Sequence, residues 1–162
     1  MPNVYLGLGT NLGDKDRNLR RAVGHLQKKI GNVLSLSSFY ETAPWGFVSE
    51  HSFLNAVACL ETELAPADVL RRTQEIEKEM GRTHKSVDNV YTDRLIDIDL
   101  IDCDGCVLHT DTLTLPHPLM HRRAFVLQPL CDVWPQWRPP VLHRTATELW
   151  HALLPPPDAC KC

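Results

Sequence analysis

Long apolar runs and a surplus of basic residues are both missing from this 162-residue sequence. A transmembrane helix needs about 18 or more consecutive apolar residues, and no run here reaches that length, so we expect no membrane span. The formal net charge is -3, whereas nucleic-acid-binding domains usually carry a basic surplus. A membrane protein and a nucleic-acid binder are therefore both unexpected.

The familiar phosphate and zinc signatures are also incomplete. The chain has no GxxxxGK[ST] P-loop, and its first glycine-rich stretch fails the dinucleotide fingerprint because Leu12 stands where the third glycine belongs. Cys103 and Cys106 have CxxC spacing, but no second close pair with zinc-finger spacing accompanies them. Their Asp104-Gly105 centre is more typical of a two-residue turn.

No basic stretch followed by an apolar segment precedes the first predicted strand, so we expect no signal peptide. In a chain without one, the six cysteines are expected to be reduced thiols. A cytoplasmic protein is the resulting expectation.

Hydrophobic periodicity predicts one α+β domain over residues 1–162. Strands are predicted at 4–10, 32–43, 52–64 and 95–101, helices at 14–31 and 66–81, then short helical pieces broken by Pro129 and a last helix near 146–153. The β-α-β-β-α-β order with a C-terminal helical extension is that of a ferredoxin-like sandwich.

Two carboxylates share one face of the last predicted strand. Asp97 and Asp99 alternate with the apolar Ile96, Ile98 and Leu100, so the carboxylates project together. They stand about 6.6 Å apart along the strand and, at an effective dielectric of 20, repel by ~2.5 kcal/mol. Either nearby cations or a divalent metal can offset this repulsion, and Mg²⁺ is typically held by one or two carboxylates plus phosphates. The spacing alone leaves both open.

Basic residues bracket the acidic pair. They are Arg82, His84, Lys85 and Arg94 before it, and His117, His121, Arg122 and Arg123 after it. Arg and Lys clamp phosphate oxygens, so this combination favours a metal with a polyphosphate. Surface charge pairing remains the ordinary explanation for any one of them.

Two further pairs are candidates for binding. Phe53 and Asn55 share the polar side of the third predicted strand, where a ring beside an amide suits a flat heterocycle, with sheet packing as the alternative. Gln74 and Glu77 share a face of the second helix, and a solvated face is the simpler interpretation.

Six segments together make the chain resemble the 6-hydroxymethyl-7,8-dihydropterin pyrophosphokinases of the folate pathway. They are GLGTNLGD at 7–14, SSFYETAPWG at 37–46, FLNAV at 53–57, QEIEKEMGR at 74–82, DRLIDIDLI at 93–101 and LPHPLMHRRAFVLQPL at 115–130. The resemblance implies transfer of pyrophosphate from ATP to the hydroxymethyl oxygen of the pterin, with release of AMP and in-line attack at the β-phosphorus.

The resemblance also implies roles for residues. Asp97 and Asp99 would hold two Mg²⁺ ions on the triphosphate, and Arg82 and Arg94 would act with them in catalysis. The other nucleotide-side positions are Gln74, Glu77, His84, Lys85, Ile98, Thr114, His117 and Arg123. The pterin-side positions are Thr42, Ala43, Trp45, Phe53, Asn55 and Phe125, with the two phenylalanines on opposite ring faces. ATP and the pterin are the implied partners, and we expect a monomer.

The loop at 82–93 departs from the family pattern. His84 stands where many members have a second arginine, and Tyr91-Thr92-Asp93 stands where many have Trp-Gly-Pro, in a loop two residues longer. The alternatives are a non-catalytic ferredoxin-like binding module and another DxD-dependent nucleotidyl or glycosyl transferase. Release of AMP from ATP would distinguish the pyrophosphokinase from both.

Overall fold

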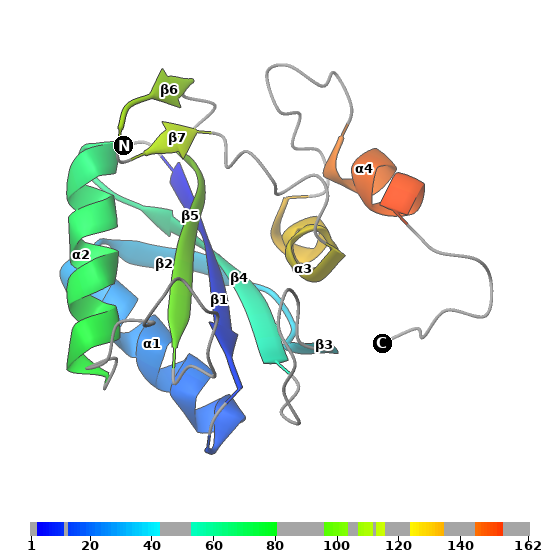
Figure 1. Cartoon of the computed structure of the whole chain (residues 1–162), viewed down its shortest axis with the longest axis horizontal. Helices are drawn as coiled ribbons and strands as arrows, with labels where there is room; N and C mark the ends of the chain where they lie inside the picture. The colour runs from blue at the N-terminus through cyan, green and yellow to red at the C-terminus, as the bar shows by residue number, and fades with distance from the viewer. Residues whose placement is uncertain are drawn as a thin grey trace.

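The computed structural model describes residues 3–11, 13–42, 53–80, 96–103, 107–111, 113–115, 124–134 and 145–153 (Figure 1). The elements in chain order are β1 (Asn3–Thr10), α1 (Lys15–Lys29), β2 (Asn32–Leu36), β3 (Tyr40–Thr42), β4 (Phe53–Glu61), α2 (Pro66–Glu79), β5 (Asp97–Cys103), β6 (Leu108–His109), β7 (Thr114–Leu115), α3 (Ala124–Val133) and α4 (Ala146–Leu153). No helix in these ranges is long and apolar enough to cross a membrane.

The main sheet is antiparallel, with the strand order β2-β4-β1-β5, and β3 pairs with β4 on the same side as β2. β1 is central, since Leu8 faces Ala56 of β4 on one side and Ile98 of β5 on the other. The strands predicted first, second, third and last thus stand in the order 2-3-1-4. This confirms the ferredoxin-like arrangement.

The strand predicted over 32–43 is interrupted at Ser37, between β2 and β3. The Ser37 backbone N–H donates to the Val57 carbonyl at 2.9 Å, and the Ser37 hydroxyl accepts from the Val57 N–H at 2.9 Å. A side-chain oxygen thus takes the place of a strand carbonyl, which is why one continuous strand was the wrong prediction.

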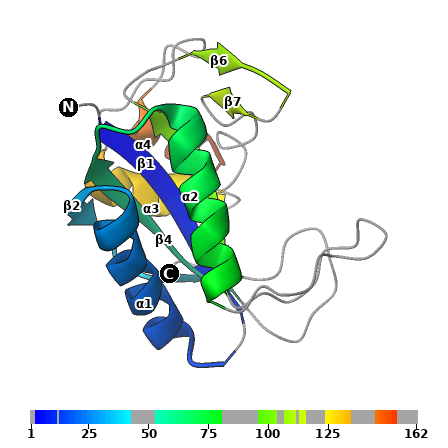
Figure 2. The ribbon, with the colours of Figure 1, turned by 90° about the vertical axis from the view of Figure 1, so that its left-hand side faces the viewer.

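The two faces of the sheet carry separate cores, and Figures 1 and 2 show α1 and α2 on one face with α3 and α4 on the other. On the α1–α2 face, Leu54, Ala56, Ala58 and Leu60 of the third predicted strand form an apolar row that belongs to this core. The second core is made of Tyr5, Val57, Cys59 and Ile101 with residues of α3 and α4 such as Val126, Leu127, Leu130 and Leu149.

β5 extends to Cys103 and contains a bulge. Leu6 pairs with Leu100 whereas Tyr5 pairs with Asp102, so Ile101 is an extra residue on β5. The shift places Cys103, rather than Asp102, in the core on the α1–α2 face. The bulge therefore lets the buried strand continue through Asp102, which simple alternation would have pointed into that core.

Two features of the C-terminal extension differ from the prediction, and one agrees. α3 continues through Pro129 instead of breaking there, because Val126, Leu127 and Leu130 pack against the sheet and this tertiary contact outweighs the local cost of proline. The β6–β7 hairpin was not predicted, since two-residue strands carry no periodicity. The last predicted helix is confirmed as α4, whose first turn is capped because the Thr145 hydroxyl accepts from the Glu148 N–H at 3.1 Å.

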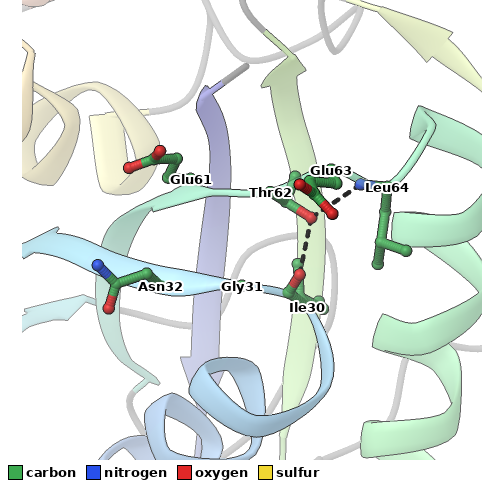
Figure 3. Close-up of a pocket in the computed structure, with 7 residues that line it drawn as sticks. All are labelled: Ile30, Gly31, Asn32, Glu61, Thr62, Glu63 and Leu64. Atoms are coloured by element: carbon green, nitrogen blue, oxygen red, sulfur yellow. Dashed lines mark hydrogen bonds between the residues drawn. The ribbon is translucent and has the colours of Figure 1, made fainter. Parts of the chain in front are cut away.

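The junction of α1, β2 and β4 leaves room only for glycine at position 31. A Cβ atom there would overlap the carbonyl oxygen of Glu61. Beside it the Thr62 hydroxyl donates to the Ile30 carbonyl at 2.7 Å and accepts from the Leu64 N–H at 3.1 Å (Figure 3). This close backbone approach fixes where α1 ends and β2 begins.

We expect Gly31→Ala to lower the free energy of unfolding by about 2 kcal/mol or more, because two backbone segments must separate to admit the methyl group. Gly24→Ala is the matched control: a Cβ at this exposed helical position would meet nothing within 4 Å, so alanine should stabilise α1 by about 0.5–1 kcal/mol. Urea unfolding of both variants checks this. Equal stabilities would contradict the inferred overlap.

Candidate active site

A row of four residues crosses the sheet on the face opposite α1 and α2. Gly9 of β1 pairs with Asn55 of β4 and with Asp97 of β5, and Asn55 pairs in turn with Tyr40 of β3. Directly opposite residues of antiparallel strands project from the same face. A phenol, an amide and a carboxylate therefore line up across the sheet, and we call Tyr40, Asn55, Gly9 and Asp97 the polar row.

The second carboxylate lies one step along β5 on the same face. Asp99 pairs with Gly7, and both Asp97 and Asp99 are half-buried. Ile96, Ile98 and Leu100 are buried in the core on the opposite face. The alternation predicted for this strand is thus confirmed.

Gly7 and Gly9, the glycine strip, keep β1 free of side chains between the carboxylates and the amide. A Cβ at Gly9 would stand 3.1 Å from Asn55 Oδ1 and 3.5 Å from Phe53 Cδ1, so these side chains lie directly over the backbone of β1. A Cβ at Gly7 would stand 3.4 Å from Ile101 Cδ1, an ordinary contact. Glycine at position 9 is therefore what allows Asn55 and Phe53 to approach β1.

α3 and α4 cover the other half of this face. Tyr5 of β1 stacks on Trp134, with ring centroids 4.3 Å apart, and Ile101 packs in the same core with Val126 and Leu127. The half-buried Asp97, Asp99 and Phe53 lie beyond this packed region, toward the end of β1. Polar and apolar halves thus share one sheet face.

Glu77 supports the backbone between the two carboxylates. Its side chain is only 6% exposed, and Oε2 accepts from the Ile98 N–H at 3.1 Å. β5 is an edge strand, so this carboxylate satisfies an N–H on the side away from β1. Gln74 is exposed, as a solvated face requires, whereas that interpretation is wrong for the buried Glu77. The periodicity of α2 gave no signal for this role, because the Ile98 N–H that binds Glu77 lies far away along the chain.

The other predicted site residues are placed only in part. Ile98 is buried on the α1–α2 face, and Thr114 is half-buried on β7, which contacts β5. Thr42 ends β3, and Phe125 lies in the first turn of α3. Arg82, His84, Lys85, Arg94, His117, Arg123, Ala43 and Trp45 lie outside the described residues, as do the loop at 82–93 and the predicted Asp104-Gly105 turn.

The donor chemistry of Asp97 and Asp99 fits a magnesium ion that is shared with a substrate. Within the described ranges, no group of three or more His, Cys, Asp and Glu side chains could hold a metal by itself. Mg²⁺ commonly uses one or two carboxylates and takes its remaining oxygen ligands from water and phosphate. Two half-buried carboxylates on one face meet that requirement.

A pocket of about 470 Å³ lies elsewhere, lined by residues 30–32 and 61–64 (Figure 3). Glu61 in this pocket pairs with Asn3, at the start of β1, whereas the polar row crosses β1 at Gly9. The pocket and the polar row therefore lie at opposite ends of β1.

A sequence model for a family described as 7,8-dihydro-6-hydroxymethylpterin-pyrophosphokinase matches residues 5–135. The chain belongs to this family. A Porphyromonas gingivalis protein named 2-amino-4-hydroxy-6-hydroxymethyldihydropteridine pyrophosphokinase is 52% identical over 140 residues, which cover 86% of this chain and 95% of that protein. A protein of the same name from Aquifex aeolicus is 33% identical, over 91% of this chain and 90% of that protein. The resemblance to pyrophosphokinases is thereby confirmed.

Longer proteins contain a similar region. The folic acid synthesis protein FOL1 of Dictyostelium discoideum is 38% identical over 96% of this chain, which spans 24% of that protein. Among solved structures, wild-type Plasmodium falciparum HPPK-DHPS with pteroate has a TM-score of 0.74 at 16% identity, covering 93% of this chain and 44% of that chain. This chain therefore spans less than half of the solved protein, and the likeness concerns the fold.

We expect Glu77→Ala to lower the free energy of unfolding by about 1–3 kcal/mol, because it leaves the Ile98 N–H without its carboxylate acceptor. Amide exchange at Ile98 should accelerate as well. Gln74→Ala, at the exposed position on the same helix, should change stability by less than about 0.5 kcal/mol. Thermal unfolding and hydrogen exchange check this, and equal effects of the two variants would exclude the supporting role of Glu77.

Proposed function

We propose that this pyrophosphokinase carries out its reaction, the transfer of pyrophosphate from ATP to 6-hydroxymethyl-7,8-dihydropterin in folate biosynthesis, on the sheet face that carries the polar row. The observation that supports this placement is the pairing of Gly9 with both Asn55 and Asp97. AMP and the pterin diphosphate are the products. We also propose that residues 1–162 form one domain, which acts as a cytoplasmic monomer.

The nucleotide belongs on the β5 side. We assign Asp97 and Asp99 to two Mg²⁺ ions, which would neutralise charge on the triphosphate and orient its β-phosphorus. Glu77 fixes the backbone at Ile98, the residue between these two carboxylates. Arg82 and Arg94 act with them in catalysis, and the other predicted nucleotide-side residues are Gln74, His84, Lys85, Thr114, His117 and Arg123.

The pterin belongs on the β4 side. Asn55 Nδ2 donates to the Tyr40 carbonyl at 3.4 Å, which turns the amide so that Oδ1 lies over Gly9. An amide oxygen in that place can accept from the N–H groups of a pterin edge. Phe53 would stack on one face of the ring and Phe125 on the other, with backbone groups of Thr42, Ala43 and Trp45 at the edge.

The spacing across β1 suits a transfer between these two sides. Neighbouring strands are about 4.8 Å apart, so the Asn55 and Asp97 backbones stand about 10 Å apart with Gly9 between them. A pterin bound at Asn55 can extend its hydroxymethyl oxygen over the glycine strip toward a β-phosphorus held at the carboxylates. The protein contributes mainly positioning and neutralisation of charge, as is usual in phosphoryl transfer.

Asp97→Asn and Asp99→Asn should each lower the rate of AMP formation from ATP on the order of a hundredfold or more, because each removes a negative ligand from the proposed metals. The ATP affinity of both variants should lose its dependence on Mg²⁺, while thermal unfolding stays cooperative. Asp16→Asn, an exposed aspartate of α1, is the control and should keep full activity. Unfolding of the site variants without a specific loss of Mg²⁺ dependence would favour a purely structural role.

Gly9→Val should weaken pterin binding by about tenfold or more, since overpacking costs about 1–3 kcal/mol and the new side chain displaces Asn55 and Phe53. ATP affinity should change much less. Gly7→Ala, whose Cβ makes an ordinary contact with Ile101, is the matched control and should stay within about threefold of the wild type. Calorimetric titration with each ligand checks this. Equal losses for pterin and ATP would argue against the assignment of sides.

A further inference from the structure

Asp132 of α3 ties the helical extension to the strand edge beside the polar row. Its Oδ2 atom accepts from the Tyr40 hydroxyl at 2.6 Å and from the Ser38 N–H at 3.1 Å. Tyr40 begins β3, and Ser38 lies in the link between β2 and β3. One carboxylate oxygen thus holds both the strand and the chain that leads into it.

The protonation state of Tyr40 suits this contact. Burial, and then the hydrogen bond to Asp132, raises the pKa of Tyr40 to about 12. The phenol is therefore the donor in this hydrogen bond throughout the physiological pH range. Such a charge-assisted hydrogen bond is stronger than one between neutral groups.

The position of Asp132 in its helix is otherwise unfavourable. It lies in the last turn of α3, where the helix dipole disfavours a negative charge, and that turn contains no basic residue. The two hydrogen bonds to Ser38 and Tyr40 offset this disadvantage. Both hydrogen bonds join α3 to β3 and the link before it, in a different layer of the molecule. They indicate a contact that organises tertiary structure.

β3 needs such a tie because it is short and, in the part of the chain that the structure describes, pairs with β4 alone. It has three residues, and the interruption at Ser37 separates it from β2. A short edge strand with few ladder bonds opens easily. Yet the Tyr40 carbonyl of this strand is the group that accepts from Asn55 Nδ2 and so orients the Asn55 amide over Gly9.

We propose that Asp132 is a positioning residue for the pterin: through Tyr40 it holds β3 against β4 and thereby fixes the amide of Asn55. The inference rests on the proposed role of Asn55 in binding the pterin. Asp132 acts on pterin binding and not on the nucleotide side, because its contacts all lie on the β3 side of the polar row.

Steady-state kinetics of Tyr40→Phe, Asp132→Ala and Asp132→Asn test this. Tyr40→Phe and Asp132→Ala should each raise KM for the pterin about tenfold, with kcat and KM for ATP within about twofold of the wild type. Asp132→Asn keeps a side-chain oxygen that can accept from the phenol, so it should restore KM for the pterin to within about threefold. Tyr40→Phe removes a single oxygen, so it keeps the test decisive if Asp132→Ala does not fold.

Thr145→Ala is the control for a merely structural effect. It removes the cap of α4 on the same face of the sheet without touching Tyr40, and should lower the melting temperature with KM for the pterin unchanged. If Tyr40→Phe and Asp132→Ala behave like this control, lowering stability with no selective change in KM for the pterin, the positioning role is overturned.

Asn55→Ala separates this inference from the function on which it rests. If Asn55→Ala leaves KM for the pterin unchanged, the proposed pterin side is wrong. If Asn55→Ala raises KM but Tyr40→Phe does not, only the role of Asp132 and Tyr40 fails. If Asn55→Ala and Tyr40→Phe both raise KM for the pterin, the variant that combines them should raise it by less than the product of the two single effects. The reason is that the two changes act through one amide.

Discussion

The register of β1 between its two neighbours is the constraint on which the candidate site depends. Gly9 faces Asn55 and Asp97 at once, and Gly7 faces Asp99. A slip of β1 by one residue would turn Gly7 and Gly9 to the opposite face and bring Leu8 out of its core. The apolar packing of the α1–α2 face therefore also decides which side chains meet on the other face.

Stability and the proposed binding of substrates depend on different parts of the two sheet faces. The core under α1 and α2 runs the length of the sheet, whereas α3 and α4 cover only the part near Tyr5 and Cys59 on the other face. What remains beyond that core carries the carboxylates, the amide and the ring. Asp132 and Glu77 link these layers: one connects α3 to β3, and the other connects α2 to β5.

Local pattern was sufficient for the strands and helices that alternate or repeat regularly. The apolar row from Leu54 to Leu60 and the position of Asp97 and Asp99 on one face both follow from periodicity. The interruption at Ser37, the passage of α3 through Pro129 and the burial of Glu77 could not follow from it. Each depends on a partner far away in the chain, namely Val57, the second core and Ile98.

β5 shows how a stable fold accommodates an arrangement that is unfavourable by itself. Two carboxylates two residues apart repel, and a strand selected for stability alone would separate them. Here Ile96, Ile98 and Leu100 anchor the opposite face of the strand, and the Glu77 carboxylate holds its edge N–H between the two acids. Because these contacts are independent of the acidic face, that face can carry the charges of the proposed metal–nucleotide site without disturbing the core. The same separation is the reason to expect that the acids can be replaced without loss of the fold.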